Sequence, residues 1–136
     1  MDPSPVTDGS GDTGRDGALD SKIGPFYTTA SMAEVLDISL SETMRRLEAG
    51  EVLGAQLADG AWVCPTWQLT NSQVRPEFLD LWRVLIKSAD AWTALLWICA
   101  PHPDLDNQSP RQWIDNEHPA ELAESLAAGV ASRWAQ

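Results

Sequence analysis

The sequence has few of the residues on which catalytic and metal sites depend. Among 136 residues there are two histidines, and neither has a second ligand at the spacing of a zinc site. The chain has no glycine-rich phosphate loop, no GxSxG motif, and no cysteine–histidine pair with an orienting acid. Asp104 and Asp106 resemble a catalytic carboxylate pair but flank Leu105 in a turn. We therefore expect a protein that is not an enzyme and binds no metal and no cofactor.

Cysteines and long apolar runs are also scarce. Cys64 and Cys99 stand alone in apolar surroundings, which predicts two buried free thiols rather than a disulfide. No signal peptide is recognisable, and no apolar run is long enough to cross a bilayer. We expect a soluble, cytoplasmic protein with no membrane contact.

Positive charge is in short supply throughout the chain. Nine Lys and Arg face 20 Asp and Glu, giving a net charge of −11. Acids outnumber bases in each of the segments 1–24, 25–70 and 71–136, so no segment has the basic surface typical of nucleic-acid binding. An acidic surface favours solubility and basic protein partners.

Tryptophan, in contrast, is abundant, with seven Trp beside two Phe and one Tyr. This enrichment suits either a tight small core or a binding face. The length fits one compact domain or two very small ones. Residues 1–24 are rich in Gly, Asp, Ser, Pro and Thr, and this composition predicts a disordered acidic tail.

Residues 25–70 carry the signals of two short helices. Thr28 or Thr29 can cap a first helix that runs through residues 31–36. Ser39 can cap a second helix, and Glu42 stands at the position that completes a capping box. The apolar stripe predicted for this second helix consists of Leu40, Met44 and Leu47.

A β-hairpin is predicted after the second helix. Gly50 ends the helix, and Asp59-Gly60 then stands between two apolar segments, residues 52–57 and 61–63. A helix, a short turn, a helix and a hairpin make up a winged helix-turn-helix. We therefore predict such a module for residues 25–70.

This segment also resembles the excisionase/MerR-like DNA-binding family. The matching residues are Tyr27-Thr28, Ala33-Glu34-Val35-Leu36, Ser39, Arg45-Arg46, Gly50, Trp62 and Pro65. Ser31 departs from the family, which usually has glutamate there. The resemblance covers Phe26 to Leu69 and implies that the second helix enters the major groove.

The outward face of that helix would carry the DNA-contacting groups. These candidates are Ser41, Thr43, Arg45 and Arg46. Arginine reads guanine, and serine or threonine can bind phosphate. Alternatively, the two arginines only solvate an exposed helix and pair with Glu42 or Glu48. Because two arginines face six acids in residues 25–70, we expect operator binding that needs a partner's help.

Residues 71–136 are predicted to be helical. A turn-rich link precedes an amphipathic helix from Glu77 to about Lys87, and Asp90 caps the next helix. A third helix begins at Ser109-Pro110, and the last one covers residues 120–134. The fold class is therefore mainly α: a small winged helix-turn-helix followed by a helical domain.

Part of this helical segment is similar to the toxin-binding domain of Xre/MbcA/ParS-type antitoxins. The signature residues are Trp97, Pro101, Leu105, Ser109, Pro110, Trp113 and Ile114. The likeness extends upstream to the strand-like run Cys64–Leu69, so that it covers Trp62 to Trp134. Asn107 departs from the usual glycine, although asparagine tolerates a left-handed turn, and Cys64 departs from a common aromatic.

The resemblance implies an antitoxin that neutralises a cognate toxin of the RES type, which degrades NAD, and that can repress its own operon. It also implies that the segment 129–136 covers the toxin's active site. The partner-binding candidates are Val130, Arg133, Trp134 and Gln136. Alternatively, Trp134 folds back on Trp92 or Trp113. The signature residues themselves are expected to shape the domain rather than to contact the toxin.

Two other functions stay open. The chain can be a stand-alone DNA-binding transcriptional regulator or a phage-type architectural protein, with residues 77–136 as a dimerisation bundle. It can also be an adaptor whose winged module no longer binds DNA. Co-purification with an NAD-degrading protein favours the antitoxin, whereas salt-sensitive operator binding by the chain alone favours the regulator. We expect a homo-oligomer or a hetero-complex.

Overall fold

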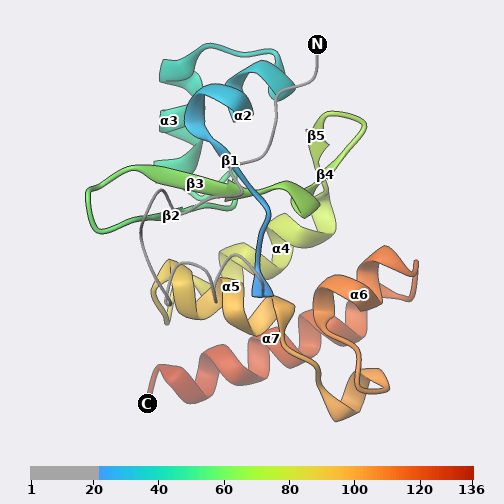
Figure 1. Ribbon diagram of the computed structural model, residues 1–136. Coiled ribbons are helices and arrows are strands. Elements are labelled where there is room, and N and C mark those ends of the chain that lie inside the picture. Colours follow the sequence, from blue (N-terminus) through green and yellow to red (C-terminus); the bar gives the residue numbers. More distant parts are fainter. Residues whose placement is uncertain (1–21) are drawn as a thin grey trace. The chain divides into compact units, whose positions relative to one another are not determined.

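The computed structural model describes residues 22–136, which belong to two units that divide between Arg75 and Pro76 (Figure 1). The boundary lies after the expected position at residue 70, because residues 69–74 form a hairpin. Most of the predicted acidic tail lies outside the described residues. Its last part was assigned wrongly: Ile23 is fully buried, so the ordered fold begins before Phe26.

The N-terminal unit begins with a strand that leads directly into a helix. β1 (Phe26–Thr28) pairs antiparallel with β3 (Trp62–Pro65), and Tyr27 lies opposite Cys64. β2 (Ala55–Gln56) pairs with the other edge of β3, giving the strand order β1-β3-β2. β1 is not among the elements that the sequence pattern predicts. Thr28, its last residue, is also the N-cap of α2 (Thr29–Leu36).

Capping residues set the ends of the helix-turn-helix. The backbone N–H of Ser31 donates to Thr28 Oγ1 over 3.1 Å, and that of Glu42 donates to Ser39 Oγ over 3.0 Å. α2 ends at Asp37, which is left-handed with φ 58°. α3 (Leu40–Ala49) ends at Gly50 with φ 77°. Both predicted caps and the glycine stop are therefore confirmed.

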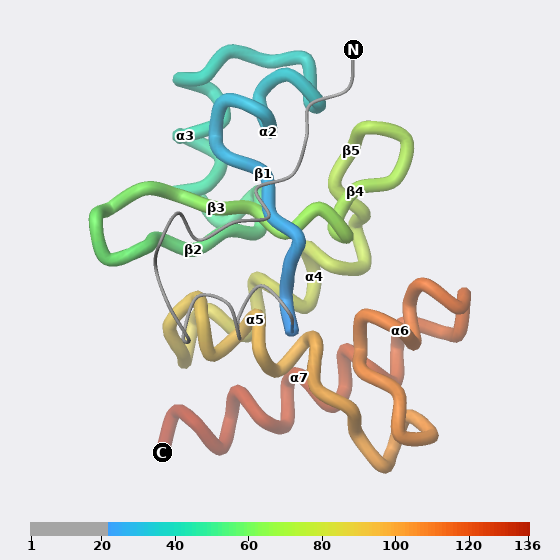
Figure 2. The backbone as a smooth tube through the Cα atoms, viewed as in Figure 1, coloured from blue at the N-terminus to red at the C-terminus, as the bar shows by residue number. Residues whose placement is uncertain are grey.

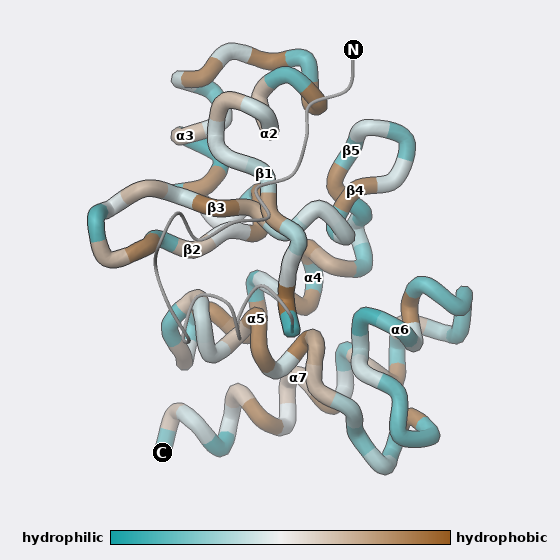
Figure 3. The backbone as a smooth tube through the Cα atoms, in the orientation of Figure 1, coloured by the Kyte–Doolittle hydropathy of each residue, from teal (hydrophilic) through white to brown (hydrophobic). Residues whose placement is uncertain are grey.

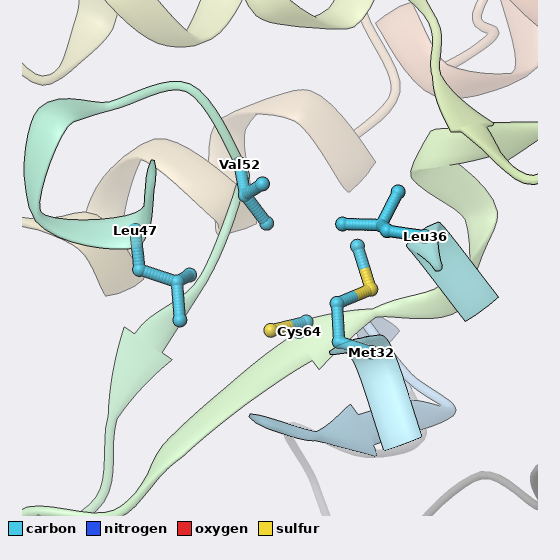
Figure 4. Packing of buried hydrophobic residues seen from close by; sticks show 5 residues of the cluster. All are labelled: Met32, Leu36, Leu47, Val52 and Cys64. Atoms are coloured by element: carbon cyan, nitrogen blue, oxygen red, sulfur yellow. The ribbon is translucent and has the colours of Figure 1, made fainter. Parts of the chain in front are cut away.

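A small apolar core lies between the two helices and the sheet. Its members point toward one another in Figure 4: Met32, Leu36, Leu47, Val52 and Cys64. The predicted stripe of α3 was partly wrong. Leu47 is buried as expected, but Leu40 is 52% exposed. Thr43 is buried instead of Leu40, four residues before Leu47, which is one helical turn.

The wing and the residues after it differ in detail from the sequence prediction. The β2–β3 hairpin forms around Asp59-Gly60 as predicted, although β2 is shorter than residues 52–57 (Figure 2). The run Cys64–Leu69 is not one strand, because Thr66–Gln68 forms the 3-10 helix η1. The expected link instead contains a second hairpin, in which β4 (Leu69–Thr70) pairs with β5 (Gln73–Val74).

Gln68 connects the wing to the segment that follows α3. Its side chain is fully buried. The side-chain oxygen accepts from the backbone N–H of Leu53 at 2.8 Å, and Nε2 donates to the carbonyls of Leu53 and Pro65 at 2.8 and 2.9 Å. Nearby, a Cβ at Gly54 would lie 2.5 Å from Leu47, so the backbone approaches closely here.

The C-terminal unit is helical, as predicted. It consists of α4 (Pro76–Leu85), α5 (Ala91–Cys99), the 3-10 helix η2 (Pro103–Leu105), α6 (Pro110–Asp115) and α7 (Ala120–Trp134). Asp90 caps α5, and its carboxylate accepts from the backbone N–H of Thr93 at 2.7 Å. The predicted capping box of α6 is present, because Ser109 and Gln112 exchange hydrogen bonds.

Small residues form the buried face of α7. Ala123, Ala127 and Ala131 are turned inward, and α7 packs against α4 and α6. Leu122 is 41% exposed, so it does not belong to the core. The alanine spacing lets the helices approach closely. Within the described part of the chain, no helix is long and apolar enough to span a membrane.

Candidate functional site

The first candidate site is the outward face of α3. Ser41 and Arg45 are exposed there, and Arg46 is half-buried. Thr43 is not on this face: its side chain is fully buried and its hydroxyl donates to the carbonyl of Ser39 at 3.0 Å. The expectation that Thr43 contacts DNA is therefore wrong, because its hydroxyl is used inside the helix.

Both arginines of α3 are already ion-paired. Arg45 donates from Nε and Nη2 to the two carboxylate oxygens of Glu42, at 2.9 and 2.8 Å. Its Nη1 and Nη2 also face the carboxylate of Glu51, at 3.5 and 3.2 Å. Arg46 donates from Nε to Glu42 at 2.9 Å. The alternative prediction that the two arginines pair with glutamates of α3 is therefore confirmed for Glu42, whereas the contact of Arg45 with Glu51 was not predicted.

These contacts strongly affect the ionisation of Glu42. Hydrogen bonds from Arg45 and then Arg46 lower its pKa to about 2, against an ordinary value of 4.5. The pKa of Arg45 is raised, first by its hydrogen bond with Glu42 and then by that with Glu51. Glu42 does not close the predicted capping box, because its carboxylate turns to the arginines instead.

Leu40, Glu48 and Ala49 are also exposed on α3. Leu40 is the first residue of the helix, directly after the Ser39 cap. Glu48 is exposed and lies one turn after Arg45. The surface therefore contains an apolar group, a hydroxyl and charges of both signs, rather than a basic stripe.

The second candidate site is the turn between α5 and α6, drawn largely in the hydrophilic colour in Figure 3. His102 and Gln108 form an isolated antiparallel bridge that closes this turn. Asp106 and Asn107 are left-handed, with φ 56° and 62°, which explains why an asparagine can replace glycine at 107. Leu105 is fully buried beneath them.

Most signature residues of this turn are buried. Leu105, Ser109, Pro110, Trp113 and Ile114 lie inside the helical unit, Trp97 is half-buried, and Pro101 is exposed. The indole N–H of Trp113 donates to the carbonyl of Pro119 at 2.8 Å. Aromatic contacts join Trp97 to His102 and Trp113 to His118, with ring centroids 4.7 and 4.2 Å apart.

The C-terminal candidates lie on the last two turns of α7 and just after it. Arg133 and Gln136 are exposed, and Trp134 is half-buried at the helix end. Val130 is 8% exposed and belongs to the core of the helical unit. The prediction that Val130 contacts a partner is therefore wrong, because its side chain already packs inside this unit.

An acidic surface runs along α4 and α7 of the helical unit. Desolvation, followed by the charges of Asp80, Glu121 and Glu77, raises the pKa of Glu124. No sequence pattern marks this cluster, because its members come together only when α7 packs on α4. Among residues 22–136, no group of three His, Cys, Asp or Glu side chains is arranged to hold a metal ion.

Comparisons with known proteins bear on the fold. No protein-family model and no curated protein matches the chain. Among solved structures, the NMR structure of Rv2175c is similar to it, with a TM-score of 0.57 and 24% sequence identity. The match covers 82% of this chain and 80% of that chain. At this identity the likeness shows the fold alone: a mainly helical protein with small antiparallel sheets, consistent with a winged helix-turn-helix followed by helices.

Proposed function

We propose that the chain binds duplex DNA through its winged helix-turn-helix, with α3 in the major groove and the β2–β3 hairpin as the wing. One observation carries this proposal: a capped α3 presents Ser41 and Arg45 outward within the same unit as the hairpin. Arginine can read guanine, and a serine hydroxyl can bind phosphate.

Binding by the chain alone should be weak. Residues 22–75 contain four Lys or Arg and six Asp or Glu, a net charge of −2. Arg45 must also release carboxylate partners before its guanidinium can contact phosphate, and Arg46 shares the carboxylate of Glu42. A second copy, or a protein bound to the helical unit, would add the contacts that a single module lacks.

Duplex selection from a random library, followed by affinity measurement at several salt concentrations, tests the proposal. Arg45→Ala should weaken binding to the selected duplex by roughly tenfold or more, because a lost arginine–guanine contact costs about 1–3 kcal/mol. Arg83→Ala is the matched control: Arg83 is an exposed arginine of α4, in the other unit. Failure to select any duplex, even at low salt, would overturn the proposal.

A second, finer function is that of an antitoxin, with a RES-type, NAD-degrading toxin as its partner and no catalysis of its own. It is supported by the signature turn, which closes over Leu105 as a compact unit. It is also supported by the end of α7, where Arg133 and Gln136 are exposed and Trp134 is half-buried. Trp134 could anchor in a pocket of the toxin, and Arg133 could pair with polar groups there.

Co-expression with the product of an adjacent reading frame tests this second function, with cellular NAD as the readout. Arg133→Glu combined with Trp134→Ala should abolish protection, as should truncation after Val130. The point variants are needed because truncation also removes the buried Ala131. Ser125→Ala, an exposed position of α7, should keep protection. Full protection by the double variant would refute a C-terminal contact with the toxin.

A further inference from the structure

The guanidinium group of Arg45 has almost no donor left for DNA. A guanidinium carries five N–H donors, and four hydrogen bonds join that of Arg45 to Glu42 and Glu51. The side chain is nevertheless 54% exposed. Arg45 is therefore accessible to a nucleic acid but is occupied by carboxylates of its own unit.

Glu42 is the shared partner of both arginines. Its oxygens accept from Arg45 at 2.9 and 2.8 Å and from Arg46 at 2.9 Å. Glu42 stands three residues before Arg45 and four before Arg46, so the helix itself sets both spacings. Glu51 joins Arg45 from beyond the end of the helix. One carboxylate thus pairs with both of the arginines that α3 would bring to phosphates.

We infer that Glu42 is a specificity-determining residue, which masks Arg45 and Arg46 from phosphates and thereby suppresses non-specific binding. The inference rests on the proposed DNA-binding function and deepens it. Non-specific affinity comes almost entirely from arginine and lysine contacts with phosphates, so masking these groups removes it first. A cognate site also offers base edges, and the resulting bidentate contacts can compensate for the loss of the carboxylate partners.

This masking contact is weak enough to be exchanged. Exposed ion pairs between side chains contribute little net stability, because solvent and salt screen them. DNA can therefore displace Glu42 when it offers enough other contacts. Glu51 should have a smaller effect than Glu42, because it contacts Arg45 alone and at longer distances.

A set of glutamate-to-glutamine variants tests the inference. The full chain is titrated with a random-sequence duplex and with a selected duplex, each at several salt concentrations. Glu42→Gln should raise the affinity for the random duplex by on the order of tenfold. The slope of the logarithm of the binding constant against the logarithm of the salt concentration should become more negative by about one to two. Affinity for the selected duplex should rise less, so the ratio of specific to non-specific binding falls.

The matched control is Glu48→Gln. It changes net charge by the same amount on the same helix, yet Glu48 belongs to none of the described ion pairs of Arg45 and Arg46. Glu48→Gln should have the smallest effect, with Glu51→Gln between the two. Adding Arg45→Ala and Arg46→Ala to Glu42→Gln should return non-specific binding to the wild-type level or below.

Three outcomes count against the inference. Equal gains from Glu42→Gln and Glu48→Gln would show a general charge effect and would overturn the masking role while leaving DNA binding intact. If the gain in affinity for the random duplex persists after both arginines are replaced, the masking role is likewise overturned and DNA binding is left intact. If no variant binds any duplex, including Glu42→Gln at low salt, the proposed function fails together with the inference.

Discussion

Gln68 is a neutral polar side chain that lies fully inside the N-terminal unit. Its amide makes three hydrogen bonds to backbone atoms: two to Leu53, which is 15 residues away along the chain, and one to Pro65, which is three residues away. Buried polar groups are tolerated where such partners are present. This residue therefore fixes the segment after α3 against the strand of the wing.

Replacing Gln68 should destabilise the protein more than replacing an exposed glutamine does. Gln68→Leu leaves the Leu53 N–H without its partner, and an unsatisfied buried group costs about 1–3 kcal/mol. The control is Gln73→Leu, at an exposed position of β5. Urea unfolding followed by circular dichroism compares the two. Similar losses in both variants would contradict the structural role given to Gln68.

The ionisation of Glu42 predicts an effect of acid. Its pKa is depressed to about 2 in the folded state, so its stabilising contribution is complete above about pH 4.5. That contribution is lost as the pH falls from about 4.5 towards 2. NMR titration of the Glu42 carboxyl carbon should show this low midpoint, and Arg45→Ala should move it upward. A midpoint near the ordinary value in the wild type would argue against the ion pairs in solution.

At the scale of elements, α7 depends on the small size of its inward side chains. Ala127 is fully buried where α7 packs on its neighbours, whereas Ala128 is exposed. Ala127→Leu should cost about 1–3 kcal/mol of unfolding free energy, because extra atoms in a packed interface force side chains or backbone to shift. Ala128→Leu should be nearly neutral. Chemical unfolding of both variants checks this, and equal stabilities would refute the packing.

The limits of sequence reasoning also appear at this scale. Helix starts were predictable because a cap and its partner lie three residues apart, as with Ser39 and Asp90. The exposure of Leu40 and the burial of Thr43 were not predictable, because they depend on which side of α3 meets the rest of the unit. The periodic pattern therefore predicted the helix correctly but assigned Leu40, rather than Thr43, to its buried face.

The candidate site was predictable to a similar degree. The arginines of α3 and their pairing with Glu42 follow from local helical spacing. The contact of Arg45 with Glu51 requires the chain to turn after Gly50, and no local sequence pattern predicts that these two side chains come within contact distance. The hairpin at residues 69–74 was read as a link, although Asn71 in a left-handed turn was a usable signal.

For the whole molecule, each unit has its own core and its own cysteine. Cys64 lies in the N-terminal unit and Cys99 in the helical unit, and both thiols are free. Burial raises the pKa of Cys64 to about 12 and that of Cys99 to about 11, against an ordinary 9.0. Since the thiolate is the reactive form, both should be protected in the folded protein.

Thiol labelling should therefore report on each unit separately. Iodoacetamide at mildly alkaline pH should react with both folded thiols much more slowly than with unfolded thiols, and with Cys64 more slowly than with Cys99. Leu47→Ala removes a core side chain beside Cys64 and should cost about 2–5 kcal/mol. It should lower the urea midpoint for labelling Cys64 more than that for Cys99, as mass spectrometry can measure. Equal shifts would contradict separate cores.

The direct passage from β1 into α2 has a mechanical consequence. Thr28 ends the strand and caps the helix, and β1 is held along its length by β3. A force applied to the chain ahead of Ile23 therefore reaches the buried Ile23 and the β1–β3 ladder before it reaches α2. A surface tether or a fusion partner attached on that side should leave the orientation of α3 within its unit undisturbed.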